Sequence, residues 1–261
     1  MLIMQFQKSE KYSIDNIGFF YQISQDEFVH CSLFYTKYIT WMKGTKRTER
    51  PFVYDVLFGV VGNSFYFIKD GIIKKAELCN NQVVIIDSFK IEQGLKYLCN
   101  SFFLHYFIER DNNPNVVYAI AMGDYRSNHG IKFNISIDEL KKYKHVNVYG
   151  DFLFGISRTG NSSSIRRHRS DSEETLEKKE LPMMYGQPVI FNNRIFYLTV
   201  QAELISVNMN DFSHEIMKTN LDRTSLLVGI DENGTVNAQT QASHAPGYIL
   251  TAKLPEKYTV S

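Results

Sequence analysis

A chain of 261 residues, 44% of them hydrophobic, can fill one large core or two small ones, which excludes a wholly disordered protein. The 29 Lys and Arg residues nearly balance the 28 Asp and Glu residues, so no global charge would attract nucleic acid or an anionic membrane. We therefore expect neither of them as a partner. The 19 Phe and 16 Tyr residues, against 6 Pro residues, favour β-strands.

The cysteines Cys31, Cys79 and Cys99 are widely spaced and form no Cys-x-x-Cys pair. We expect free thiols in a reducing compartment, and neither a metal nor a cofactor. The sequence contains no run of about 18 apolar residues, and the apolar run at residues 1–4 is too short for a signal peptide. These features predict a cytoplasmic protein, with the nucleus as the alternative location.

Strand and turn signals recur along the chain in units of three or four expected strands. Residues 1–12 are expected to supply one outer strand, and a polar connector is expected over residues 43–50. The strongest hairpin signals are Asp70-Gly71 and Asn192-Asn193, because both pairs tolerate the positive φ of a two-residue turn. The units cover residues 15–44, 54–86, 96–137, 145–156, 187–209 and 226–240, followed by a last strand at 248–252.

One short helix is expected over residues 137–144. Ser136 can cap it, because Glu139 follows three residues later, as in a capping box.

The fourth unit ends at a stretch rich in Ser, Arg, Glu and Lys. Residues 158–184 contain so few apolar side chains that burial would not offset the entropy lost on ordering, which predicts a disordered insertion within a single domain of residues 1–261. Ser170 and Ser172 lie there between basic and acidic residues, an arrangement typical of protein kinase substrates. Both serines are candidate sites of regulatory phosphorylation. A phosphate on Ser170 would neutralise the short basic patch of Arg166, Arg167, His168 and Arg169.

A polar loop at residues 123–130 gathers an acid, a guanidinium and an imidazole between two glycines. Asp124, Arg126 and His129 are the candidate binding residues, since loops between strands often contact ligands. A plain solvated loop is the alternative interpretation. Residues 155–159 (GISRT) miss the nucleophile-elbow pattern, because Thr159 stands where the second glycine is needed.

Acidic residues recur after the central strands of several units. Their ordinary role is to form turns, because Asp side chains bond their own backbone. A set of carboxylates around a common axis is the alternative. The residues concerned are Asp26, Asp70, Asp111 and Glu232.

The repeated units, seen best at residues 192–197 (NNRIFY) and 62–67 (GNSFYF), resemble blades of the β-propeller superfamily, over residues 15 to 252. The likeness is closest to kelch-type blades, in which a turn precedes a hydrophobic strand, with WD40-type blades as the other possibility. The di-glycine that marks kelch blades is absent. The Trp-Asp pair of WD40 blades is absent too, since Trp41 is the one tryptophan of the sequence.

The resemblance implies an all-β, β-propeller-like domain of about six degenerate blades with three to four strands each; a paired β-sandwich with structural duty is the alternative. Pairing of residues 248–252 with the first unit would close such a fold. We expect a non-catalytic scaffold that presents its loops to a protein or peptide partner and serves as a kinase substrate. The alternative is a propeller-type hydrolase that acts on a glycan or small ester. No catalytic residue and no metal ligand is assigned.

Overall fold

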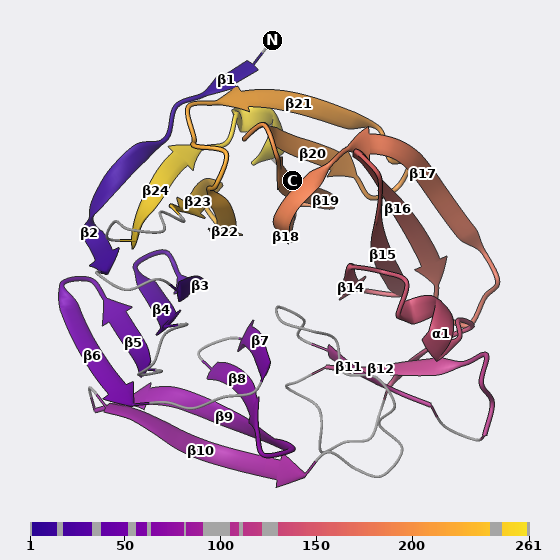
Figure 1. Cartoon of the computed structure of the whole chain (residues 1–261), viewed down its shortest axis with the longest axis horizontal. Helices are drawn as coiled ribbons and strands as arrows, with labels where there is room; N and C mark the ends of the chain where they lie inside the picture. Colours follow the sequence, from indigo (N-terminus) through magenta and orange to yellow (C-terminus); the bar gives the residue numbers. More distant parts are fainter. Residues whose placement is uncertain are drawn as a thin grey trace. The chain divides into compact units, whose positions relative to one another are not determined.

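The computed structural model of the chain describes residues 2–14, 18–32, 38–51, 56–61, 64–80, 82–90, 105–109, 112–121, 130–240 and 247–259. These residues form six small sheets with few helices (Figure 1). The all-β prediction is therefore confirmed, and the alternative of two paired sheets is wrong. None of the helices in the described ranges has the length and apolar character needed to cross a membrane.

The first two sheets are four-stranded, and each strand pairs with the next along the chain. The first sheet consists of β3 (Gly18–Ser24), β4 (Glu27–Ser32), β5 (Tyr38–Lys43) and β6 (Lys46–Pro51). The second consists of β7 (Val56–Val61), β8 (Ser64–Lys69), β9 (Ile72–Cys79) and β10 (Gln82–Lys90). The prediction of a polar connector over residues 43–50 is wrong for most of this range, because β6 lies there. This strand is charged and lacks the alternation of apolar and polar residues by which a half-buried strand is identified.

The next two sheets are joined by the short helix α1 (Ile137–Leu140). The third sheet consists of β11 (His105–Ile108), β12 (Val117–Ala121) and β13 (Ile131–Phe133). The fourth consists of β14 (His145–Tyr149), β15 (Phe152–Thr159), β16 (Ser162–Arg169) and β17 (Thr175–Pro182).

The last two sheets each take a strand from the amino-terminal segment. The fifth sheet contains β18 (Met184–Phe191), β19 (Arg194–Thr199), β20 (Leu204–Asn208), β21 (His214–Thr219) and β1 (Leu2–Met4). The sixth contains β22 (Leu226–Ile230), β23 (Thr235–Gln239), β24 (Gly247–Lys253) and β2 (Gln7–Ile14). The 3-10 helix η2 (Glu256–Tyr258) follows β24.

The pairing of β2 with β24 brings distant parts of the chain together (Figure 1). The strands are antiparallel, with Gln7 opposite Thr251 and Ile14 opposite Gly247. β1 adds to β21 in parallel. The sequence prediction of an outer strand from residues 1–12 is confirmed. The predicted pairing of residues 248–252 with the first unit is wrong, because β24 pairs with β2, which precedes that unit in the chain.

Two predicted hairpin turns have the backbone that their residues favour. Asn192 and Asn193 have φ values of 44° and 54°, and Asp70 and Gly71 have 52° and 70°. Consecutive residues with positive φ form the type I′ turn, whose twist matches that of the flanking strands.

Residues 158–184 are not a disordered insertion, and the prediction of one is wrong. β16 pairs with β15 over its whole length, from Phe152 opposite Arg169 to Thr159 opposite Ser162, and β17 completes the sheet. Ser163, Ile165 and His168 of β16 are buried. Two polar side chains, Ser163 and His168, therefore fill buried positions of this strand, which hides its pattern from a search for apolar residues.

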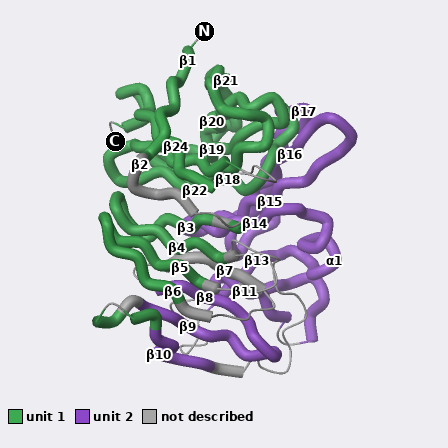
Figure 2. Tube along the Cα trace, turned by 60° about the vertical axis from the view of Figure 1, so that its left-hand side comes forward, with its two compact units in different colours: residues 1–53, 78–83, 182–261 green, residues 54–77, 84–181 purple. Residues whose placement is uncertain are grey.

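The chain divides into two compact units (Figure 2). The first comprises Met1–Val53, Leu78–Val83 and Pro182–Ser261, and the second comprises Tyr54–Glu77 and Val84–Leu181. In the second unit, buried side chains of the third and fourth sheets and of α1 form one core. Its members are Phe107, Val117, Ala119, Phe133, Ile135, Ile137, Leu140, Tyr143, Val146 and Leu153.

Within the first unit, Gln239 of β23 joins the sixth sheet to the first. Its side-chain oxygen accepts a hydrogen bond from the Phe20 backbone N–H at 2.7 Å, and its amide donates to the Gly18 carbonyl at 3.0 Å. Gln239 is 2% exposed. The buried side chain of Gln239 thus satisfies one backbone N–H and one backbone carbonyl of β3, as a neighbouring strand would.

Candidate functional site

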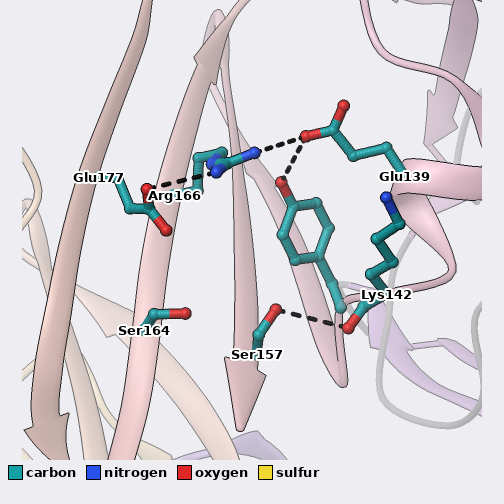
Figure 3. A pocket seen from close by; sticks show the side chains of 7 residues that line it. Glu139, Lys142, Ser157, Ser164, Arg166 and Glu177 are labelled. Atoms are coloured by element: carbon teal, nitrogen blue, oxygen red, sulfur yellow. Dashed lines mark hydrogen bonds and ion pairs between the residues drawn. The ribbon is translucent and has the colours of Figure 1, made fainter. Parts of the chain in front are cut away.

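The candidate site lies on the fourth sheet, beside α1, and α1 positions its first carboxylate. Ser136 caps the helix as the sequence predicts, because its hydroxyl accepts a hydrogen bond from the Glu139 backbone N–H at 3.1 Å. Ile137 and Leu140 point into the core, which leaves Glu139 on the side of the helix that faces the sheet's polar surface (Figure 3).

Tyr143 follows the helix and lies with its ring against the sheet. Its hydroxyl is 2.7 Å from His168 Nε2 and 3.3 Å from Glu139 Oε1. Burial, followed by the Glu139 charge, raises the pKa of the Tyr143 hydroxyl above its ordinary value, and burial lowers the pKa of His168. At neutral pH both groups are therefore uncharged, and the tyrosine serves as a hydrogen-bonding group rather than as a base.

Arg166 of β16 lies between two carboxylates (Figure 3). Its Nη1 is 2.7 Å from Glu139 Oε1, and its Nη2 is 3.2 Å from Glu177 Oε2 on β17. The side chains of Arg166, Glu139 and Glu177 are 37%, 32% and 30% exposed. Burial alone would lower the pKa of Arg166, but the bond to Glu177 and the charges nearby raise it. The guanidinium is thus a permanent cation that pairs with both acids, and the three groups together keep one negative charge.

These groups line an open pocket of about 220 Å³ (Figure 3). The Ser157 hydroxyl donates to the Lys142 carbonyl at 3.4 Å. Two acidic and two basic side chains, three hydroxyls and one aromatic ring offer a partner both signs of charge and a flat surface. The lining residues are Glu139, Lys142, Tyr143, Ser157, Ser164, Arg166 and Glu177.

The binding residues predicted from the sequence, Asp124, Arg126 and His129, lie outside the residues that the structure describes. Asp26 and Asp70 lie in turns of two different sheets, and Asp111 lies outside the described residues. In the described ranges, no group of three His, Cys, Asp or Glu side chains could hold a metal ion.

Ser170 and Ser172 lie in the turn between β16 and β17, on the same hairpin as Arg166 and Glu177. Ser170 forms an isolated bridge with Phe133, and its N–H donates to the Asp151 carbonyl at 2.8 Å. The Ser172 hydroxyl accepts a hydrogen bond from the Glu174 N–H at 3.0 Å.

Sequence reasoning missed the pocket because Arg166 and Glu177 were assigned to a disordered segment. The capping box was the one usable signal, since it places Glu139 on a short helix next to the fourth sheet.

No protein-family model and no curated protein matches the sequence. The WD40 β-propeller domain of Doa1 is structurally similar, with a TM-score of 0.50 and 12% identity, over 94% of this chain and 96% of that one. Sqt1 of Saccharomyces cerevisiae has a TM-score of 0.49 and 9% identity, over 97% and 100%. BamB of Moraxella catarrhalis has a TM-score of 0.40 and 12% identity, over 87% and 70%. At such identities a likeness concerns the fold alone.

Proposed function

We propose, on the premise that this chain is a β-propeller with its six sheets as blades, that it is a non-catalytic scaffold that binds a protein or peptide partner. In this proposal the pocket beside α1 receives a side chain of the partner. Propeller blades expose their connecting loops and outer strands, which gives a broad surface for contacts.

The observation that carries the proposal is the bridging of Glu139 and Glu177 by Arg166. A general base needs a carboxylate that can take up a proton, and a nucleophile needs such a base beside it. Here both carboxylates bond a guanidinium, and the Ser157 hydroxyl bonds a carbonyl oxygen. Charged groups held in fixed positions by one another suit recognition of a polar partner, because little ordering remains to be done on binding.

The alternative, a propeller-type hydrolase, needs a pair of carboxylates that flank a scissile bond. In the described pocket the place between the two carboxylates is taken by Arg166 (Figure 3). Hydrolysis of chromogenic esters or glycosides by the purified chain, lost in a Glu139→Gln variant, would favour the hydrolase.

The scaffold is tested by affinity purification from native cells with the wild-type chain and with Arg166→Glu. This variant places three acids in the pocket, so a partner that docks there should be lost. Lys141→Glu is the matched control, because Lys141 lies beside the pocket in an exposed pair with Asp138. Partners retained by Lys141→Glu and lost by Arg166→Glu would support the proposal.

A second variant guards against loss of folding. Ser164→Arg fills the pocket from β16 while the Arg166 bridge stays in place. If both Arg166→Glu and Ser164→Arg keep every partner at an unchanged melting temperature, the pocket is not the binding site.

A further inference from the structure

The turn between β16 and β17 brings cations and carboxylates together beside a hydroxyl. Arg169 Nη1 lies 3.3 Å from Glu174 Oε2, and Arg167 Nη2 lies 3.9 Å from Glu174 Oε1. Lys132 of β13 adds a third cation, with its Nζ 3.7 Å from Asp171 Oδ1. Three cations from two sheets thus meet at one turn, and each is held by a carboxylate of the turn itself.

These ion pairs are weak enough to be exchanged. The side chains of Glu174 and Asp171 are 53% and 69% exposed, and ion pairs in contact with water contribute little to stability. Arg167 is held in place by its burial, at 14% exposed, and by the Phe152 ring 4.7 Å away, so that it can exchange Glu174 for a phosphate without moving far. A phosphate carries nearly two charges and three acceptor oxygens at neutral pH, so it competes well against one carboxylate for an arginine.

The hydroxyl of Ser172 lies beside these ion pairs. Its Oγ accepts the Glu174 N–H at 3.0 Å, so it lies beside the residue that both arginines contact. Ser172 is half-buried, and its neighbours Asp171 and Glu173 are exposed at the tip of the hairpin. Ser170 differs, because its backbone is bonded to Asp151 and bridged to Phe133. A kinase would have to break these contacts to extend the chain at Ser170.

We propose that Ser172 is a phosphorylation site and that its phosphate binds Arg167 and Arg169 in place of Glu174. In the transfer, the Ser172 oxygen forms a bond to the γ-phosphorus of ATP held by a protein kinase. The bond from that phosphorus to the β–γ bridging oxygen breaks, ADP leaves, and the hydroxyl proton passes to the base of the kinase. The proposal does not depend on the identity of the scaffold's partner.

The first test asks which serine accepts phosphate. The full chain, Ser172→Ala and Ser170→Ala are incubated with an arginine-directed serine/threonine kinase and radiolabelled ATP. Labelling of the wild type and of Ser170→Ala, with loss in Ser172→Ala, is expected. Label that persists in Ser172→Ala overturns the proposal.

The second test asks whether the arginines bind the phosphate, and it needs no kinase. Phosphoserine is placed at position 172 during synthesis, and its second pKa, ordinarily about 6, is followed by phosphorus NMR. Lys132, Arg167 and Arg169 lower this pKa, whereas the carboxylates of Asp151, Asp171, Glu173 and Glu174 raise it. We expect a net fall of about one unit, the size typical of charge-assisted bonds to partly exposed groups.

The same measurement on Arg167→Gln with Arg169→Gln should return the pKa to its ordinary value. Phosphoserine at Ser213, an exposed hairpin residue whose hydroxyl bonds Asp211, is the matched control. An equal pKa at positions 172 and 213, or no change in the double glutamine variant, overturns the proposal.

Discussion

The ring of Tyr143 occupies the space where a side chain of Gly155 would begin. A Cβ atom on Gly155 would stand 2.4 Å from the Tyr143 Cδ2 and Cε2 atoms, closer than any real contact. Gly155→Ala should therefore push the ring off β15 and cost about 1–3 kcal/mol of unfolding free energy, as overpacking does. Urea unfolding measures the loss.

A double-mutant cycle shows whether the ring is the cause. In the Tyr143→Ala background the space above Gly155 is vacant, so Gly155→Ala should cost about 1 kcal/mol less than in the wild type. Additive effects of the two substitutions would mean that the cost arises elsewhere.

Arg166→Ala removes the cation that bridges Glu139 and Glu177. Because all three side chains are only about a third exposed, the loss should be about 1 kcal/mol, at the upper end for a surface pair. The more exposed Lys141–Asp138 pair is the comparison, and Lys141→Ala should cost less than about 0.5 kcal/mol. Equal urea midpoints for the two variants would contradict a structural role for the bridge.

His30 makes stability depend on pH. It is 1% exposed, lies 4.8 Å from the Phe20 ring between centroids, and its Nε2 has no hydrogen-bond partner among the described residues. Burial lowers the pKa of His30 to about 4, from 6.5. The unfolded chain therefore binds the proton more readily, so the stabilising contribution is complete above pH 6.5 and is lost as the pH falls towards 4.

At pH 5 the loss from His30 amounts to about 2 kcal/mol by this linkage. His30→Leu should reduce the fall in unfolding free energy between pH 7 and pH 5. Some decrease in the unfolding free energy should remain in the variant, since burial also lowers the pKa of His105 to about 4. Denaturant curves at the two pH values measure the change, and an unchanged difference would rule out His30 as its source.

Deletion of residues 245–261 should abolish cooperative unfolding of the first unit. It removes β24, which lies between β23 and β2 in the sixth sheet, and takes Ala252, Leu254 and Tyr258 out of the core. Deletion of residues 1–4 removes only β1 and the burial of Met4, and should cost about 2 kcal/mol. Thermal unfolding of the two deletion variants measures the difference. A melting temperature unchanged by deletion of residues 245–261 would contradict the structural role of β24.

The architecture could be predicted because its signals are local. Asn192-Asn193 and Asp70-Gly71 need only their own backbone preferences to make a turn, and the aromatic strands beside them alternate or run apolar. β17 was missed because five of its eight residues are exposed and two are half-buried, so no alternation exists to be read. β16 was missed because Ser163 fills an inward position without being apolar.

The pocket could not be predicted because it is made by distant residues. Glu139 and Arg166 are 27 residues apart, and Arg166 and Glu177 are 11 apart. Which charges meet depends on the register of β15 with β16 and on where α1 packs, and neither is written in the local pattern of charges.

The borrowed strand β2 imposes an order on the folding of this chain. During synthesis the backbone groups of β2 remain without their partner strand until more than two hundred further residues have been added and β24 can pair with it. Contacts so distant in sequence form slowly, and an unpaired strand can meet a neighbouring chain in the meantime. The sixth sheet thus combines the second strand of the described chain with three of the last strands, so its completion comes late in folding.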